Sequence, residues 1–477
     1  MSSAHITQEV IDHVDRVWAD DIVGRLHEYI AIPCVSVHFD PEWRANGHLD
    51  RAVELARQWC TAREITGLTV EVLELPGRTP VLLCEVPASG HASPHDTVLL
   101  YGHLDKQPEM EPWAPGLGPW LPVLRGDRLY GRGGADDGYS VFAALIGIGA
   151  LREAGGRHAR IMVLIEASEE SSSMHLSAHL ERLLPRIGTA DLVVTLDSFC
   201  ESYDRLWTTT STRGVCGGVL EIEVCADDPH SGRASGVLPS SFRILRQLLD
   251  RIEDSSTGAL LLRTATVSIP DHRIREAAVA AEAFPRLSES FRPVAGIVPM
   301  AANAHEELLN ETWRPALEVI GIDGIPPVAD AGNVFRSRLG VKLSLRLPPT
   351  ADTWAVGEEL RSVLEADPPF GATVRLHDGA RGPGWESPTF EPWLAAAIED
   401  ASMRHWGIPS ASCGVGGTIP FMGMLGEQMP DAQFLLVGVL GPESNAHGPN
   451  EFLHLPTVRR VTATVTDVLR AHAARYA

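Results

Sequence analysis

A histidine and an aspartate stand two residues apart in Tyr101-Gly-His-Leu-Asp105, directly after an apolar run typical of a buried strand. Side chains at positions i and i+2 of an extended chain lie on the same face, which brings His103 beside Asp105. A carboxylate that accepts one ring N–H fixes the histidine tautomer and leaves the other nitrogen free for a metal. The pair therefore predicts a metal-binding histidine with its partner; a histidine that caps a strand end beside a surface acid is the alternative.

Two adjacent aspartates, Asp136 and Asp137, lie in the glycine-rich segment Tyr130-Gly-Arg-Gly-Gly-Ala-Asp-Asp-Gly138, ahead of a predicted helix over residues 139–154. Glycine allows the backbone to bend tightly near a ligand. The glycines do not form a G-x-G-x-x-G nucleotide pattern, and no adequate strand precedes them. Aspartate also caps helices, and one of the two can do so. Two acids among four glycines favour a carboxylate that bridges two metals.

Four more candidate residues follow in the chain. Glu169 and Glu170 leave a predicted strand as neighbours, so their side chains point in different directions. One can bind a cation while the other holds a proton near a bound water, as metal-assisted hydrolysis requires. Asp197 ends the next strand and His447 lies in the loop Asn445-Ala-His-Gly-Pro-Asn-Glu451. Taken alone, Asp197 is typical of a cap and His447 of an ordinary hydrogen-bonded residue.

Together these residues are a donor set for two divalent cations about 3.5–4 Å apart with a shared carboxylate. No cysteine is among them, which favours zinc, with manganese or cobalt as alternatives, in a catalytic rather than a structural site. Such a pair of cations lowers the pKa of a bridging water toward about 7. The residues therefore predict a two-metal hydrolytic centre, with donors drawn from His103, Asp136 or Asp137, Glu169 or Glu170, Asp197 and His447.

The periodicity of the chain indicates how these residues are positioned. Short β-rich runs alternate with helical stretches up to about residue 196, which is typical of an α/β domain with a mostly parallel sheet. Ligands of such sheets gather beyond the carboxyl ends of the strands. The predicted strands are residues 68–73, 81–86, 97–101, 161–166 and 192–196.

The pattern changes after residue 212. We expect an inserted second domain over residues 213–384, with alternating strands at 219–225 and 341–347 and a helix at 353–364. The α/β pattern resumes over residues 385–477, which include a buried strand at 433–439. The catalytic domain is therefore expected to be discontinuous, formed by residues 1–212 and 385–477.

Composition excludes several classes of protein. The 477 residues carry 40 Lys and Arg against 62 Asp and Glu, a formal charge of −22, which argues against nucleic acid as a partner. Apolar runs are too short to cross a membrane. Residues 1–20 lack the order of a secretory signal and predict an amphipathic helix. The seven scattered cysteines, without a C-x-x-C pair, favour a reducing cytoplasm.

The order of these motifs, with Asp-Pro-His-Ser-Gly232 between them, resembles peptidase family M-twenty, and most of all its carnosinase and cytosolic non-specific dipeptidase branch. The resemblance runs from about residue 20 to the C-terminus. It implies an amide-bond hydrolase with a phosphorylase/hydrolase-like catalytic domain, in which two metals are held by His103, Asp136, Glu170, Asp197 and His447. It further implies Asp136 as the bridging ligand, joined to Asp137 by a cis peptide, with Glu169 as general base and Asp105 as the partner of His103.

The resemblance also implies that the inserted segment is an α+β lid and dimerisation domain. His230 falls where the family has an oxyanion-stabilising histidine that serves the partner subunit's site; a turn histidine is the alternative. Arg346 and Asn333 fall where relatives bind the substrate carboxylate, a task that suits a guanidinium fork. The loop Gly416-Gly417-Thr418 is expected to add further contacts to that carboxylate.

Two departures from the family pattern bear on substrate choice. Asp136-Asp-Gly-Tyr139 lacks the lysine of close relatives, and Ala380 stands where dipeptidases have a lid histidine, with His377 near but offset. The expected activity is hydrolysis of dipeptides or short peptides with a free C-terminal carboxylate. A deacylase of N-acyl amino acids shares every catalytic residue and is the alternative; a non-catalytic metal- or peptide-binding relative is a third reading.

Overall fold

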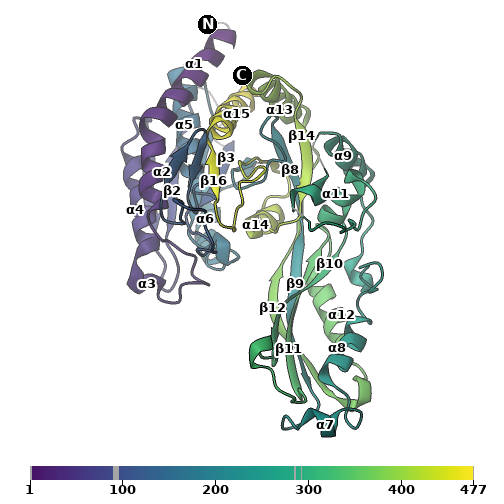
Figure 1. The fold of residues 1–477 in the computed structure, drawn as a ribbon. Helices are drawn as coiled ribbons and strands as arrows, with labels where there is room; N and C mark the ends of the chain where they lie inside the picture. Colours follow the sequence, from purple (N-terminus) through teal and green to yellow (C-terminus); the bar gives the residue numbers. More distant parts are fainter. Residues whose placement is uncertain (1–2, 90–95, 284–285, 292, 476–477) are drawn as a thin grey trace. The chain divides into compact units, whose positions relative to one another are not determined.

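The computed structural model describes residues 3–89, 96–283, 286–291 and 293–475, which divide into two compact units (Figure 1). Unit 1 comprises Met1–Thr210, Ser387–Cys413 and Pro420–Ala477, and unit 2 comprises Ser211–Glu386 and Gly414–Ile419. We expected residues 385–477 to belong wholly to the first domain. The structure instead assigns the short segment Gly414–Ile419 to unit 2, and with it the predicted loop Gly416-Gly417-Thr418.

Unit 1 is built on a sheet whose central strands are parallel. Its order is β1-β2-β6-β3-β7-β15-β8, and the parallel core is the run β6-β3-β7-β15. The strands β3, β6 and β7 of this core are buried along almost their whole length because both faces of the sheet are covered. This arrangement confirms the expected α/β class. Their bounds are β1 Thr69–Leu73, β2 Val81–Val86, β3 Thr97–His103, β6 Arg160–Glu166, β7 Ala190–Thr195, β15 Gln433–Leu436 and β8 Trp207–Thr212.

Helices cover this sheet. The buried helix α5 (Ser140–Glu153) packs on β3 and against α1 (Ser3–Val17) and the C-terminal helix α15 (Leu455–Ala474), while α4 (His48–Thr61) packs on β1 and β2. The expected amphipathic first helix is present as α1, and it buries Val10 and Val14. No helix among the described residues is long and apolar enough to span a membrane.

Unit 2 contains an antiparallel sheet in the order β10-β11-β9-β12. Its central strands, β9 (Gly214–Glu223) and β11 (Arg338–Leu347), alternate buried and more exposed residues, so one face packs in the core and the other does not. The helices α8 (Ser241–Leu249) and α12 (Thr353–Glu365) pack on this sheet. The edge strands are β10 (Ala316–Asp323) and β12 (Thr373–Gly382).

Candidate metal centre

Unit 1 brings all five predicted donors together from five separate parts of the chain. His103 ends β3, Asp197 follows β7, Asp136 lies just before α5, and Glu170 lies in a 3-10 turn (Glu169–Ser171) after β6. His447 follows β15 in a loop where it adopts a left-handed φ of 64°. Because β3, β6 and β7 are parallel neighbours, their carboxyl ends meet at one edge of the sheet, as expected for ligand sites in open α/β folds.

The donors form two groups whose ligand atoms lie within 4.8 Å of one another: His103, Asp136 and Asp197, and Asp136, Glu170 and His447. Asp136 belongs to both. Its Oδ1 lies 3.4 Å from His103 Nε2, and its Oδ2 lies 3.0 Å from His447 Nε2. One carboxylate thus directs one oxygen to each group, which is the geometry of a bridging ligand.

The electrostatics of the cluster fit divalent cations. Burial raises the pKa of Asp197 to about 7, and burial together with the Asp197 charge raises the pKa of Glu169 well above its usual value. Burial alone would lower the pKa of His103, but the neighbouring Asp105 and Asp136 outweigh it and raise this pKa well above normal. The buried His103 Nε2 has no hydrogen-bond partner among the described residues. A centre this rich in carboxylates is stable as anions only when it holds positive charge.

Glu169 lies beside both groups and belongs to neither. Its Oε2 is 4.0 Å from His103 Nε2, and its side chain is 11% exposed. A carboxylate that is near the donors but not one of them is free to exchange a proton. This placement agrees with the predicted division of work between Glu169 and Glu170.

Asp105 does more than the sequence indicated. His103 Nδ1 is 3.0 Å from the Asp105 carbonyl oxygen, whereas the Asp105 carboxylate is 3.6 Å away. That carboxylate accepts hydrogen bonds from the backbone N–H groups of Glu169 and Glu170, each at 3.0 Å. The Asp105 carboxylate thus lies within ion-pair distance of His103, as expected, and it also holds the turn that carries the two glutamates.

The segment before α5 is fitted closely to β3. The expected cis peptide between Asp136 and Asp137 is confirmed. Asp137 Oδ2 accepts the backbone N–H of His103 at 3.1 Å. A Cβ at Gly102 would come within 2.6 Å of the same oxygen and 2.1 Å of Ser140 Oγ, so only glycine allows this approach.

A buried ion pair joins the loops that carry Asp136 and His447. Arg132 Nη1 donates to Glu451 Oε2 at 2.6 Å, and both side chains are at most 1% exposed. Glu451 Oε1 accepts the backbone N–H of Gly133, and Arg132 Nη2 donates to the carbonyl of Gly448. Sequence analysis quoted both motifs without assigning these two residues. Their burial is not readable from a glycine-rich context that resembles a surface turn.

The remaining predicted residues lie in unit 2. Arg346 is half-buried on β11, and its Nη1 lies 3.4 Å from Thr418 Oγ1. Arg213, which sequence analysis did not single out, donates through Nε to the Gly416 carbonyl. Its backbone N–H donates to the Gly417 carbonyl. These contacts bring the predicted fork and the predicted glycine loop together, as a carboxylate site requires.

His230 and Asn333 form a second group in unit 2. The backbone N–H of Ser231, beside His230, donates to the Asn333 carbonyl, and His230 pairs with Val334. His230 Nδ1 accepts from the backbone N–H of Gly232 at 3.0 Å, and its side chain is exposed. Asn333 therefore lies with His230 and not with Arg346.

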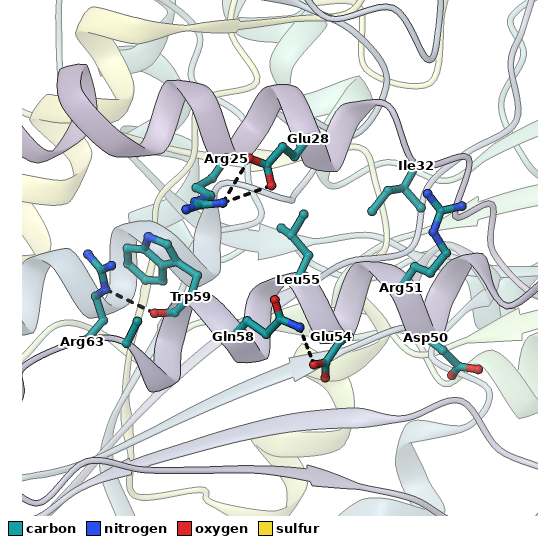
Figure 2. Close-up of a pocket in the computed structure, with 11 residues that line it drawn as sticks. Arg25, Glu28, Ile32, Asp50, Arg51, Glu54, Leu55, Gln58, Trp59 and Arg63 are labelled. Atoms are coloured by element: carbon teal, nitrogen blue, oxygen red, sulfur yellow. Dashed lines mark hydrogen bonds and ion pairs between the residues drawn. The ribbon is translucent and has the colours of Figure 1, made fainter.

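A groove of about 750 Å³ in unit 1 lies between α4 and α2 (Val23–Ile30) (Figure 2). Its charged walls are largely paired within themselves, as in the contact of Arg25 with Glu28. None of the predicted site residues lines it.

A mostly parallel α/β sheet with two histidines and three acids at its carboxyl edge, one acid shared, defines a dinuclear metallohydrolase. A family model of peptidase family M20/M25/M40 matches residues 99–471, and the chain belongs to that family. It is a metallopeptidase by that membership, in a family whose solved members include a dinuclear metal-binding peptidase from Bacillus subtilis.

Curated relatives cover most of the chain. The chain is 26% identical to a cysteinylglycine-S-conjugate dipeptidase of Corynebacterium striatum, over 91% of its own length and 92% of the relative. It is 27% identical to the beta-Ala-His dipeptidase of Homo sapiens, over 76% and 71%. In structure it is similar to the dipeptidase Dug1p of Saccharomyces cerevisiae, with a TM-score of 0.79, 21% identity and 98% coverage of both chains.

Proposed function

We propose that this protein hydrolyses dipeptides that carry a free C-terminal carboxylate. The observation that carries the proposal is the presence of Glu169 beside two donor groups that share Asp136. Relatives named as dipeptidases cover most of the chain and support the same substrate class. Both donor groups and the base lie within unit 1, so binding of the two metals needs no residue from unit 2.

The residues divide the work as follows. When bound, the two cations supply Lewis acidity and a nucleophile at neutral pH. Glu169 takes the proton of the attacking water and delivers it to the leaving nitrogen. Asp105 holds Glu169 and Glu170 in place through their backbone N–H groups. Arg346, with donors to spare beyond Thr418, binds the substrate carboxylate, and His230 donates to the developing oxyanion.

The geometry of unit 2 favours a homodimer. Arg346 is eight residues from Arg338 on β11, about 27 Å at the rise of a strand, and His230 lies beyond the Arg338 end because it pairs with Val334. A dipeptide spans only about 7 Å. One unit 2 therefore cannot offer both residues to the same substrate. Two subunits can, when each provides His230 and Asn333 to the other's site.

The edge strand β10 supports the same assembly. Val319, Ile320 and Ile322 are each at least 45% exposed on this strand, and among the described residues β10 pairs with β11 alone. An exposed apolar edge strand is a template for pairing with another chain. Antiparallel pairing of β10 with its copy would satisfy both edges and create a twofold interface.

We further propose zinc as the physiological metal and the cytoplasm as the location. Nitrogen and oxygen donors without sulfur suit a catalytic zinc site, and manganese or cobalt also accept them. Among the described residues no disulfide joins any of the seven cysteines, in agreement with a reducing compartment.

A substrate panel tests the proposal. The purified protein, loaded with zinc, should hydrolyse several dipeptides and stop when a chelator is added. N-acetyl and N-succinyl amino acids should be turned over at least tenfold more slowly. Faster release of acetate or succinate would identify a deacylase instead, and zinc binding without turnover of either class would identify a binding protein.

A further inference from the structure

A buried carboxylate that belongs to neither donor group lies behind the turn that carries Glu169 and Glu170. Glu166 is the last residue of β6, is 1% exposed and pairs in register with His103. Its Oε1 accepts hydrogen bonds from Tyr101 Oη at 2.6 Å and from Ser173 Oγ at 2.8 Å, and its Oε2 accepts one from Ser168 Oγ at 2.9 Å. Among the described residues, no ion pair of Glu166 is present, so three neutral hydroxyls satisfy this carboxylate.

Two of these hydroxyls belong to the turn itself. Ser168 immediately precedes Glu169, and Ser173 follows Glu170 by three residues. Ser172 and Ser173 both adopt left-handed backbone conformations, with φ of 61° and 49°. Such conformations are unfavourable for residues other than glycine and persist only where the surroundings hold them. Glu166 contacts the turn on both sides of the two glutamates and so holds it closed.

We propose that Glu166 is a positioning residue that fixes Glu169 and Glu170 through the hydroxyls of Ser168 and Ser173. The inference rests on the proposed roles of Glu169 as base and Glu170 as ligand. It complements Asp105, which holds the backbone N–H groups of the same two residues. Asp105 thus holds the backbone of the turn, whereas Glu166 holds the serine side chains of the turn.

This arrangement predicts an asymmetric defect. Releasing the turn displaces Glu170, which belongs to the group with Asp136 and His447. The group of His103, Asp136 and Asp197 comes from other elements and keeps its donors. A purely structural role of Glu166 would instead weaken both groups or lower stability alone.

The test is the double variant Ser168→Ala/Ser173→Ala, with Zn²⁺ titrated into the metal-free full-length protein. The dissociation constant of one zinc should rise about 10–100-fold, the usual cost of losing a partner behind a ligand, while that of the other stays within about twofold. With zinc in excess, kcat for a dipeptide should fall and KM should change little, because Arg346 is untouched.

Two controls isolate the clamp. Ser172→Ala removes an exposed hydroxyl from the same turn, and Tyr101→Phe removes a donor to Glu166 that comes from β3. Both should bind two zinc ions with constants close to those of the unmodified protein. Ser173→Ala alone should give an intermediate effect and remains measurable if the double variant folds poorly.

Unchanged zinc constants in Ser173→Ala and in the double variant would overturn the inference, and so would equal weakening of both zinc sites. These outcomes are separate from failure of the proposed function. A protein that binds two zinc ions and hydrolyses no dipeptide refutes the substrate assignment, while the zinc titration still decides whether Glu166 positions the turn.

Discussion

At the scale of single residues, proximity gives each carboxylate of the centre a different task. Asp136 points one oxygen toward each histidine, Glu169 stays outside both donor groups, and Asp105 is occupied by backbone N–H groups. Side chains of the same type therefore differ in function because their neighbours differ. Substitutions that keep shape and remove one property should separate these functions.

Glu169→Gln should retain two metals and the fold yet lose about 10²–10⁴-fold in kcat, because the amide cannot carry the proton. Asp136→Ala should lose metal as well as activity, since both donor groups use this residue. Metal content measured on the same samples as turnover separates the two effects. Near-normal turnover of Glu169→Gln would place the base elsewhere.

Arg132→Met should lower the free energy of unfolding by about 3–5 kcal/mol, because it leaves the Glu451 carboxylate buried without its cation. The matched control is Arg128→Met in the neighbouring pair with Glu443, whose side chains are 39% and 57% exposed. That pair should contribute at most about 1 kcal/mol. Chemical denaturation at fixed zinc measures both, and equal losses would contradict the argument.

The site residues that could be predicted from the sequence are those that directly follow a strand. His103 follows one apolar run, the two glutamates Glu169 and Glu170 follow a second, and Asp197 follows a third. The periodicity alone therefore places all four at one edge of a sheet. The roles of Glu166 and Glu451 could not be predicted from the sequence, because their partners are hydroxyl, guanidinium and backbone groups that come close only in the folded chain. The same limit applies to Asp105, whose carboxylate lies 3.6 Å from His103 as expected but also binds the glutamate turn, which the sequence did not predict.

At the scale of elements, strand β11 relates the two proposed functional residues of unit 2, Arg346 and His230, to each other. Arg346 lies near one end of it, and the segment that pairs with His230 precedes the other end. The alternation of β11 was readable from the sequence, and so was the register of Arg346 on the less buried face. The sequence does not predict that Gly414–Ile419 belongs to unit 2, because this assignment depends on the contact of Arg213 with Gly416, some 200 residues away.

Arg346→Met should raise KM strongly, by about 10–100-fold, for dipeptides with a free carboxylate, since it removes a charge-assisted hydrogen bond of about 1.5–3 kcal/mol. The expected effect on kcat is smaller. Steady-state kinetics on matched free and C-terminally amidated substrates measures the difference. An equal change for both substrates would refute the carboxylate clamp.

Ile320→Lys should convert the dimer to a monomer, because a charged side chain on an exposed edge strand opposes pairing with another chain. Light scattering after size-exclusion chromatography reports the mass. Zinc content should remain unchanged, since all metal donors lie in unit 1. The control is Arg375→Ala on the opposite edge strand, β12, which should leave the mass unaltered. A monomeric unmodified protein would contradict the proposed assembly directly.

At the scale of the whole molecule, the proposed function uses residues from both ends of unit 2. Arg346 and the segment that pairs with His230 lie about 27 Å or more apart along β11, so we propose that they serve one dipeptide only when they come from different subunits. In the proposed dimer, His230 of each subunit serves the site of the other. In such a dimer, each site takes Glu169 from one subunit and His230 from the other. The variants Glu169→Gln and His230→Ala therefore damage a site through different subunits.

Mixing these two variants is therefore the decisive experiment. Each should be nearly inactive alone, whereas a mixed dimer places the intact His230 of the Glu169→Gln chain at the intact metal site of the His230→Ala chain. Equal random mixing makes about half of the dimers mixed, each with one working site of two, so activity should recover toward about a quarter of the unmodified level. Subunit exchange is verified independently with differently tagged chains. Absence of recovery, with exchange demonstrated, would place His230 within its own subunit or outside the reaction.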